Sequence, residues 1–209
     1  LLASGVAAQS ATNASLDGAA RAGDHARVSA LLSAGVDVRS AERDGTTALH
    51  WAVYHDDTEM VADLTAAGAD PNRANRNAAT PLGLACRNAD PVGSGRLLGA
   101  GADPNQPASG GEPPLLTCAR TGRVAATDQL VAAGADVNST ETWRGQTALM
   151  WAAAENHADA VTRLVTAGAD VEARSSRGMT PLLFAVREGQ FASAKALVEA
   201  GADINAGIN

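Results

Sequence analysis

The sequence contains few of the residues that mark several common classes of protein. Only two of its 209 residues are cysteines, too few for a disulfide-rich scaffold. No apolar run approaches the roughly 18 residues that a membrane-spanning helix needs. Aromatic residues make up only 3% of the chain, although hydrophobic residues make up 45%. A core built from such small side chains, with alanine the most common residue, favours closely packed helices.

Basic residues are also fewer than acidic ones. Sixteen basic residues stand against 23 acidic ones, which gives a net charge of −7 and a pI near 5.0. This balance argues against attraction of the whole molecule to nucleic acid or to anionic lipid. It leaves open a basic face on one side of the molecule.

What the sequence does contain is a repeat. The tetrapeptide Ala-Gly-Ala/Val-Asp occurs six times, at spacings of 33 or 34 residues. Its glycines are Gly35, Gly68, Gly101, Gly134, Gly168 and Gly201. A second element, Thr-Ala/Pro-Leu or Pro-Pro-Leu, keeps the same register at residues 47–49, 80–82, 113–115, 147–149 and 180–182. A unit of this size cannot bury its own apolar face, so the units are expected to stack into a solenoid.

The last unit illustrates the structure expected of each repeat. Thr180 is a good N-cap, and Pro181 at the first helical position needs no amide partner, so a short first helix is predicted to begin there. A second helix is predicted from about Phe191 to Ala200, where Gly201 supplies a left-handed C-cap. The polar segments between units, rich in Gly, Asn and Ser, are predicted to be exposed, hairpin-like fingers.

These motifs resemble the ankyrin repeat, with its finger glycine, Thr-Pro-Leu-His segment and closing Gly-Ala-Asp. The resemblance implies an all-α solenoid of helix-turn-helix units with finger loops. It predicts one domain over residues 14–209, with six repeats at about 14–43, 44–76, 77–109, 110–143, 144–176 and 177–209. It also implies a non-catalytic scaffold that binds a partner protein, because the fingers and first helices of such repeats line a concave groove. The alternatives are a structural subunit that uses its ends and convex back, or an inhibitor that covers an enzyme's site.

Two readings remain open for the segment before the repeats, residues 1–13. Residues 1–8 are either the remnant of a secretory signal peptide or a degenerate capping helix, since Leu1-Leu2-x-x-Gly5-Val6 echoes Leu31-Leu32-x-x-Gly35-Val36. The first reading implies export to the periplasm or beyond, and the second a cytoplasmic protein.

The residues expected to face the groove are mostly aromatic or basic. Trp51, Trp151 and Phe184 share one register of the first helix, and Trp143 lies on a finger, where an indole has little core to join. The predicted contact set is Trp51, Tyr54, Arg73, Arg76, Arg87, Arg120, Trp143, Arg144, Trp151, Arg174, Arg177, Phe184 and Arg187. Of the six aromatic residues, only Phe191 maps to the back.

Charge is expected to be divided between the same two faces. Eleven of the 15 arginines fall on fingers or on the exposed ends of first helices, where only six acidic residues lie. The groove side therefore carries a charge of about +5 by this assignment, although the whole chain is acidic. This predicts a partner with an acidic surface and no binding of nucleic acid or of a small-molecule substrate. The competing interpretation is that these arginines are simply solvated.

No arrangement of residues predicts catalysis, a metal or another cofactor. No His, Cys or carboxylate pair has the spacing of a metal site, and Gly93-Ser94-Gly95 lacks the setting of a nucleophile elbow. His50 resembles the family histidine that links adjacent fingers. Cys86 and Cys118 lie on first helices of consecutive units, where helices about 8–10 Å apart hold the Cα atoms beyond the roughly 7 Å limit for a disulfide. We therefore expect two buried free thiols.

The first unit departs most from the regular pattern, as expected of an N-terminal cap, and the third unit departs from it too. Ala78 replaces the glycine of its finger, and Gly93 and Gly95 lie within its second helix. Each helical glycine destabilises by up to about 1 kcal/mol relative to alanine. The sequence therefore predicts a weak point in the solenoid at this unit.

Overall fold

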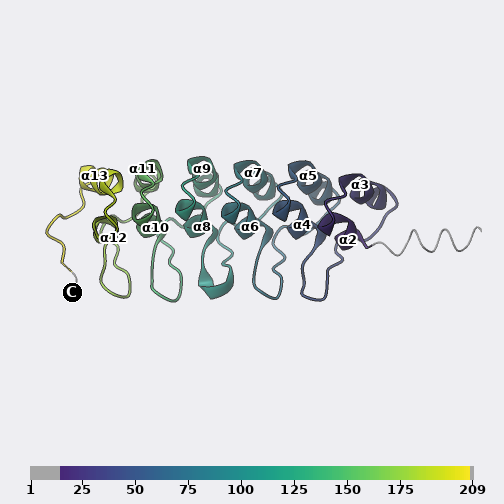
Figure 1. The fold of residues 1–209 in the computed structure, drawn as a ribbon, viewed down its shortest axis with the longest axis horizontal. Coiled ribbons are helices and arrows are strands. Elements are labelled where there is room, and N and C mark those ends of the chain that lie inside the picture. The colour runs from purple at the N-terminus through teal and green to yellow at the C-terminus, as the bar shows by residue number, and fades with distance from the viewer. Residues whose placement is uncertain (1–14, 208–209) are drawn as a thin grey trace, which may run out of the picture.

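The protein is a row of paired helices with loops projecting from one side (Figure 1). The computed structural model describes residues 15–207, in which twelve α-helices form six consecutive pairs. The first helices are α2 (Leu16–Arg21), α4 (Ala48–Tyr54), α6 (Pro81–Arg87), α8 (Pro114–Arg120), α10 (Ala148–Ala154) and α12 (Pro181–Arg187). The second helices are α3 (His25–Ser33), α5 (Thr58–Ala66), α7 (Pro91–Gly99), α9 (Val124–Ala132), α11 (Ala158–Thr166) and α13 (Phe191–Glu199).

The loops between pairs are the predicted fingers, and they lie beside one another along the row (Figure 1). The finger before α8 contains a short 3₁₀ helix, η1 (Ser109–Gly111). Backbone hydrogen bonds join neighbouring fingers, including those from the Arg76 amide to the Asp44 carbonyl at 2.7 Å and from the Ser176 amide to the Arg144 carbonyl at 2.8 Å. The fingers are therefore tied into a continuous array. The predicted N-terminal segment, residues 1–13, lies outside the described residues.

The helices begin and end as the sequence predicts. The Thr180 hydroxyl accepts a hydrogen bond from the Leu183 amide, and Pro181 occupies the first helical turn. At the other end of this unit, Gly201 has a φ of 93°, in the left-handed region where glycine carries no Cβ penalty. The next repeated residue, Asp203, accepts the Asn205 amide at 2.9 Å and stabilises the turn that follows.

His50 has the linking role that the resemblance implies. The Thr47 amide and hydroxyl lie 3.2 and 2.8 Å from its Nδ1, and its Nε2 lies 3.0 Å from the carbonyl oxygen of Ala79 in the next finger. Since the Thr47 amide donates to Nδ1, the neutral ring carries its proton on Nε2, which donates to Ala79. Burial lowers the pKa of His50, and the Ala79 carbonyl only partly offsets this effect.

The core is continuous along the row. Leu64, Leu97, Leu130 and Leu164 are fully buried on successive second helices, surrounded by alanines of the first helices. Each helix packs against its counterpart in the next pair, as α10 does against both α8 and α12. Small side chains at these contacts allow the helices to approach closely.

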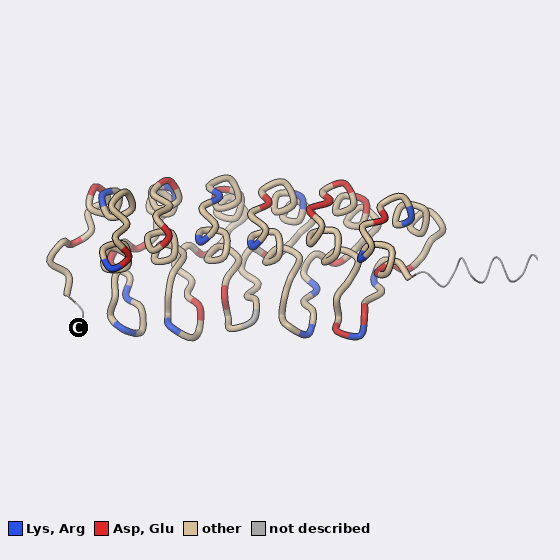
Figure 2. Tube along the Cα trace, in the orientation of Figure 1, with Lys and Arg blue, Asp and Glu red and all other residues tan. Residues whose placement is uncertain are grey.

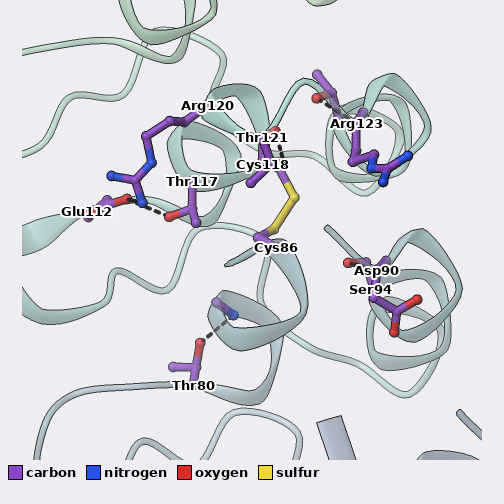
Figure 3. Close-up of a disulfide and its surroundings, with 12 residues drawn as sticks. Thr80, Cys86, Asp90, Ser94, Glu112, Thr117, Cys118, Arg120, Thr121 and Arg123 are labelled. Atoms are coloured by element: carbon purple, nitrogen blue, oxygen red, sulfur yellow. Dashed lines mark hydrogen bonds and ion pairs between the residues drawn. A yellow bond between two sulfur atoms is a disulfide. The ribbon is translucent and has the colours of Figure 1, made fainter. Parts of the chain in front are cut away.

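The prediction of two free thiols is wrong. Cys86 of α6 and Cys118 of α8 form a disulfide, with their Cα atoms 4.6 Å apart (Figure 3). Equivalent residues of neighbouring units differ by 33 in number, but these cysteines differ by 32. One residue turns a side chain by about 100° around a helix. This offset places the two cysteines on facing sides of adjacent helices instead of at equivalent positions separated by the full stacking distance.

The third unit folds like the others, although its departures from the pattern are visible. Ala78 adopts a φ of 54° in the left-handed region, where its counterparts Gly45 and Gly178 have φ values of 85° and 72°. Within α7, a Cβ on Gly93 would collide with the Asp90 carboxylate that caps the helix. A Cβ on Gly95 would lie 3.1 Å from the Gln129 amide nitrogen of α9. Both contacts are with the far ends of flexible side chains, which can move, so they do not by themselves require glycine. A weak point at this unit stays a prediction.

Candidate functional site

A row of arginines marks the tips of the fingers. Arg43, Arg76, Arg144 and Arg177 lie in the turns of four fingers, and all four are exposed. Figure 2 shows basic segments at these tips. Within residues 15–207, none of the four has a carboxylate within 4 Å, so their charges are not neutralised by ion pairs of the described chain. We call these four residues the tip row. Arg76, Arg144 and Arg177 belong to the predicted contact set, whereas Arg43 does not.

Two other arginines of the predicted contact set are held by the protein itself. Arg73 donates to the carbonyl of Arg39 at 3.1 Å, and Arg174 donates to the carbonyls of Gly178 and Gly207 at 2.9 and 3.0 Å. Arg87 is exposed at the end of α6. The first two residues therefore have a structural role in the loops.

Two further arginines of the set are paired with acids of the same face. Arg120 lies 3.6 Å from the Glu112 carboxylate, and Arg187 lies 2.7 Å from the Glu188 carboxylate. Arg73, Arg87 and Arg174 also have no carboxylate within 4 Å in the described chain, so the unpaired positive charge of this face is shared between these residues and the tip row.

The predicted aromatic residues differ widely in exposure. Trp143 is 76% exposed on its finger, and Tyr54 is 62% exposed at the end of α4. Trp51 and Trp151 are half-buried on α4 and α10. The indoles are therefore not withdrawn into the core.

Phe184 differs from the other aromatic residues of the predicted contact set in being buried. It is only 4% exposed and packs with Met150 and Met179 in a small apolar cluster. The Arg187 guanidinium lies 4.9 Å from the centre of its ring. The neighbouring methionines provide an apolar site for this ring, so Phe184 contributes little contact surface.

Four of the predicted residues lie together near α8, α10 and the finger that precedes α10. Arg120, Trp143, Arg144 and Trp151 line one pocket of about 290 Å³. Arg144 and Trp151 also line a second pocket of about 310 Å³, together with Phe184 and Arg187. The Arg144 guanidinium lies 4.1 Å from the centre of the Trp143 ring, within the range of a cation–π interaction. The sequence alone did not reveal these pockets, because they form between side chains of different units.

Glu141 organises the finger that carries Trp143. Its carboxylate accepts the amides of Trp143 at 2.6 Å, Arg144 at 2.9 Å and Gln146 at 3.0 Å. Burial acts to raise the pKa of Glu141, but these amide hydrogen bonds outweigh burial and lower the pKa below its ordinary value. The carboxylate therefore stays charged and holds the longer loop in shape.

Two tryptophans at equivalent positions have different hydrogen bonding. The Trp51 indole N–H donates to the Glu42 carboxylate at 3.2 Å, and the Arg21 guanidinium lies 5.5 Å from the ring centre. Arg120 lies over Trp151 in the same way, at 5.3 Å. Yet Nε1 of Trp151 is buried and has no hydrogen-bond partner among the residues described.

Neither a metal site nor a membrane span is found in residues 15–207. No group of three or more His, Cys, Asp or Glu side chains in this range could hold a metal ion. No helix of the same range is long and apolar enough to cross a bilayer.

The chain belongs to the ankyrin repeat family. The family described as ankyrin repeats (3 copies) matches residues 16–108, 94–175 and 115–207. Similar crystal structures include the ankyrin repeat protein EF0377, which is 26% identical with a TM-score of 0.82 over 89% of this chain and 97% of that one. They also include the ankyrin repeat domain of Bcl-3, a member of the IkappaB family, which is 26% identical with a TM-score of 0.81 over 92% and 88% of the two chains.

A third similar structure supports the fold alone. It is the ankyrin repeat domain of human ASB11, which is 24% identical with a TM-score of 0.80 over 91% of this chain and 85% of that one. No curated protein matches the chain in sequence. Ankyrin repeats generally act as protein–protein interaction modules, and the chain has the all-helical solenoid fold of such a module.

Proposed function

We propose that the protein is a non-catalytic scaffold that binds a partner protein through its fingers and first helices. We call this surface the finger face. The observation that carries the proposal is the tip row, four exposed arginines without ion pairs in the described chain, with the exposed indole of Trp143 beside Arg144. Tryptophan and arginine are the residues most often enriched at the energetic centres of interfaces.

The charge of this face indicates the chemistry of the partner. Guanidinium groups pair well with carboxylates, and opposite charges across an interface speed association. The partner is therefore proposed to present an acidic surface. Its binding should weaken markedly between low and physiological salt, because exposed charges are screened.

A charge-reversal experiment tests the finger face. The variant Arg76→Glu/Arg177→Glu reverses two charges of the tip row, and Arg27→Glu/Arg123→Glu makes the same change in net charge on the second-helix layer. Proteins captured from the native source are compared by mass spectrometry across the wild type and both variants. A partner retained by the control pair and lost by the tip-row pair supports the proposal. A partner lost only by the control pair contradicts it.

A structural subunit that uses the back of the molecule is the second candidate. Phe191 is 86% exposed at the start of α13, and Val198 of the same helix is also exposed. Light scattering separates the candidates, because a subunit of this kind is expected to self-associate through these residues. Self-association abolished by Phe191→Ser would favour the second candidate over the first.

The disulfide bears on where the protein works. Disulfides form and persist in oxidising environments, such as the bacterial periplasm or the outside of the cell. We therefore propose that the chain acts in an oxidising compartment, the first of the two readings of its location. Fractionation of native cells followed by immunoblotting tests this proposal, and recovery of the protein with only cytoplasmic markers would contradict it.

A further inference from the structure

Trp51 shows how the indole N–H of a tryptophan at this position of the repeat can find a hydrogen-bond partner within the chain. At Trp51, the indole N–H donates to the carboxylate of Glu42, which also lies 3.9 Å from the Arg21 guanidinium. Arg21 in turn covers the ring. The group of three interacting side chains, an indole, a guanidinium and a carboxylate, is therefore complete within the chain.

The same group of three side chains is incomplete at Trp151. Arg120 covers this ring as Arg21 covers Trp51, and Glu141 follows Arg120 by 21 residues as Glu42 follows Arg21. The Glu141 carboxylate, however, is directed at the amides of its own finger, which is one residue longer. The extra residue thus leaves the Trp151 indole without the carboxylate that its counterpart has.

The surroundings of Trp151 can receive a carboxylate from outside. The residue lines both pockets of the finger face described above, and Arg144 lines them as well. The other basic residues there are already engaged, Arg120 by Glu112 and Arg187 by Glu188. Arg144, a member of the tip row, is the guanidinium of these pockets that has no carboxylate within 4 Å in the described chain. Its acidic neighbour Glu141 interacts with Arg144 electrostatically but directs its oxygens at the amides of its own finger.

We infer that a glutamate side chain of an acidic partner segment binds between Trp151 and Arg144, in the pockets that both residues line. This glutamate takes the place that Glu42 has at Trp51. This inference rests on the proposed function and assigns the partner's contact residue. Because Nε1 of Trp151 is covered, binding requires a covering side chain to move. We expect this to be Arg120, which lies over the ring and is partly exposed.

The indole N–H groups provide a direct readout. The chain has three tryptophans, so a nitrogen-15 spectrum of the full chain shows three indole signals, assigned with single Trp→Phe variants. The probe is tetraglutamate blocked by acetyl and amide groups, which carries side-chain carboxylates and no terminal one. Blocked tetraglutamine is the neutral control. The expected result is a saturable downfield shift of the Trp151 indole proton with the glutamate probe alone.

Two variants sharpen the test. Arg144→Gln should weaken probe binding about fivefold, the effect of losing an exposed ion pair, while Arg123→Gln on the second-helix layer should leave it unchanged. Glu42→Ala removes the internal carboxylate at Trp51 without touching the pocket. In that variant the glutamate probe should also shift the Trp51 indole signal. In the wild type the probe should leave the Trp51 signal unchanged.

The outcomes distinguish this inference from the proposed function. A Trp151 signal that stays in place while Trp143 and the finger amides shift would overturn the inference, yet leave an acid-binding finger face intact. If no signal responds to the probe, the inference is wrong and the acidic-partner proposal is weakened too. Loss of the probe effect in Arg123→Gln to the same extent as in Arg144→Gln would also overturn the inference.

Discussion

Reduction of the disulfide between Cys86 and Cys118 should destabilise the solenoid by a predictable amount. The bond closes a loop between residues 32 apart in sequence. Constraining a loop of that length in the unfolded chain lowers its entropy by about 12 cal/mol/K, which corresponds to about 3.7 kcal/mol at 25 °C. We therefore expect the reduced protein to be less stable by about 3–4 kcal/mol.

The position of the disulfide should confine most of the lost stability to one boundary of the solenoid. Cys86 and Cys118 are fully buried, and they join α6 to α8 across the boundary between the third and fourth helix pairs. Stacked repeats contact only their neighbours, so a lost cross-link weakens one boundary more than the rest. Hydrogen exchange in the reduced protein should rise most in α6 to α9.

The assay compares urea unfolding by circular dichroism for oxidised protein and for protein reduced in denaturant and refolded with reductant. The variant Cys86→Ala/Cys118→Ala is the control, and reductant should not change its unfolding midpoint. Thiol titration of the oxidised wild type should find no reactive thiol, either before or after the protein is unfolded. A midpoint for the wild type that is insensitive to reduction, or two thiols titrated after unfolding, would refute the reasoning.

Three of the four further predictions concern single residues, and the fourth concerns a helix. Because the pKa of His50 is lowered by burial, its contribution to stability is present above the unfolded pKa of about 6.5 and is lost as the pH falls toward the folded value; the acid-induced loss of stability should be smaller in His50→Gln than in the wild type in urea titrations between pH 7 and 5. Glu141→Ala should destabilise by about 2 kcal/mol through the three amides it leaves unpaired, with Glu155→Ala as the exposed comparison, and an effect below 0.5 kcal/mol, about the size of an ordinary surface change, would contradict the role given to Glu141. Ala78→Gly should stabilise the protein by about 1 kcal/mol, because it relieves the positive φ of this residue, and a lower thermal midpoint would be the opposite result. Residues 91–100 should exchange amide hydrogens faster than residues 158–167, owing to the glycines of α7, and equal protection would remove the predicted weak point.

The repeat made the fold predictable from the sequence. The register of Thr180-Pro181 and Gly201 placed helix starts and ends correctly, because capping depends on local residues. His50 was placed correctly for a related reason, since its partners lie at fixed positions of the repeat.

The features that escaped prediction depend on differences between repeats. The disulfide arises from a spacing of 32 instead of 33, and that count was the signal that could have indicated it. The burial of Phe184 depends on two methionines from other segments, Met150 and Met179, which no local pattern connects. The unpartnered indole of Trp151 follows from where the Glu141 carboxylate points, and side-chain direction in an elongated finger is set by packing that the sequence does not display.

The exposed aromatic residues allow a direct test of the central claim that the finger face is the binding surface. Trp143 lies on a finger and Phe191 on the second-helix layer, and both are highly exposed. Hydroxyl-radical labelling of both residues is to be measured by mass spectrometry, with and without the captured partner. The account predicts that the partner protects Trp143 and leaves Phe191 labelled, whereas protection of Phe191 with unchanged labelling of Trp143 would contradict it.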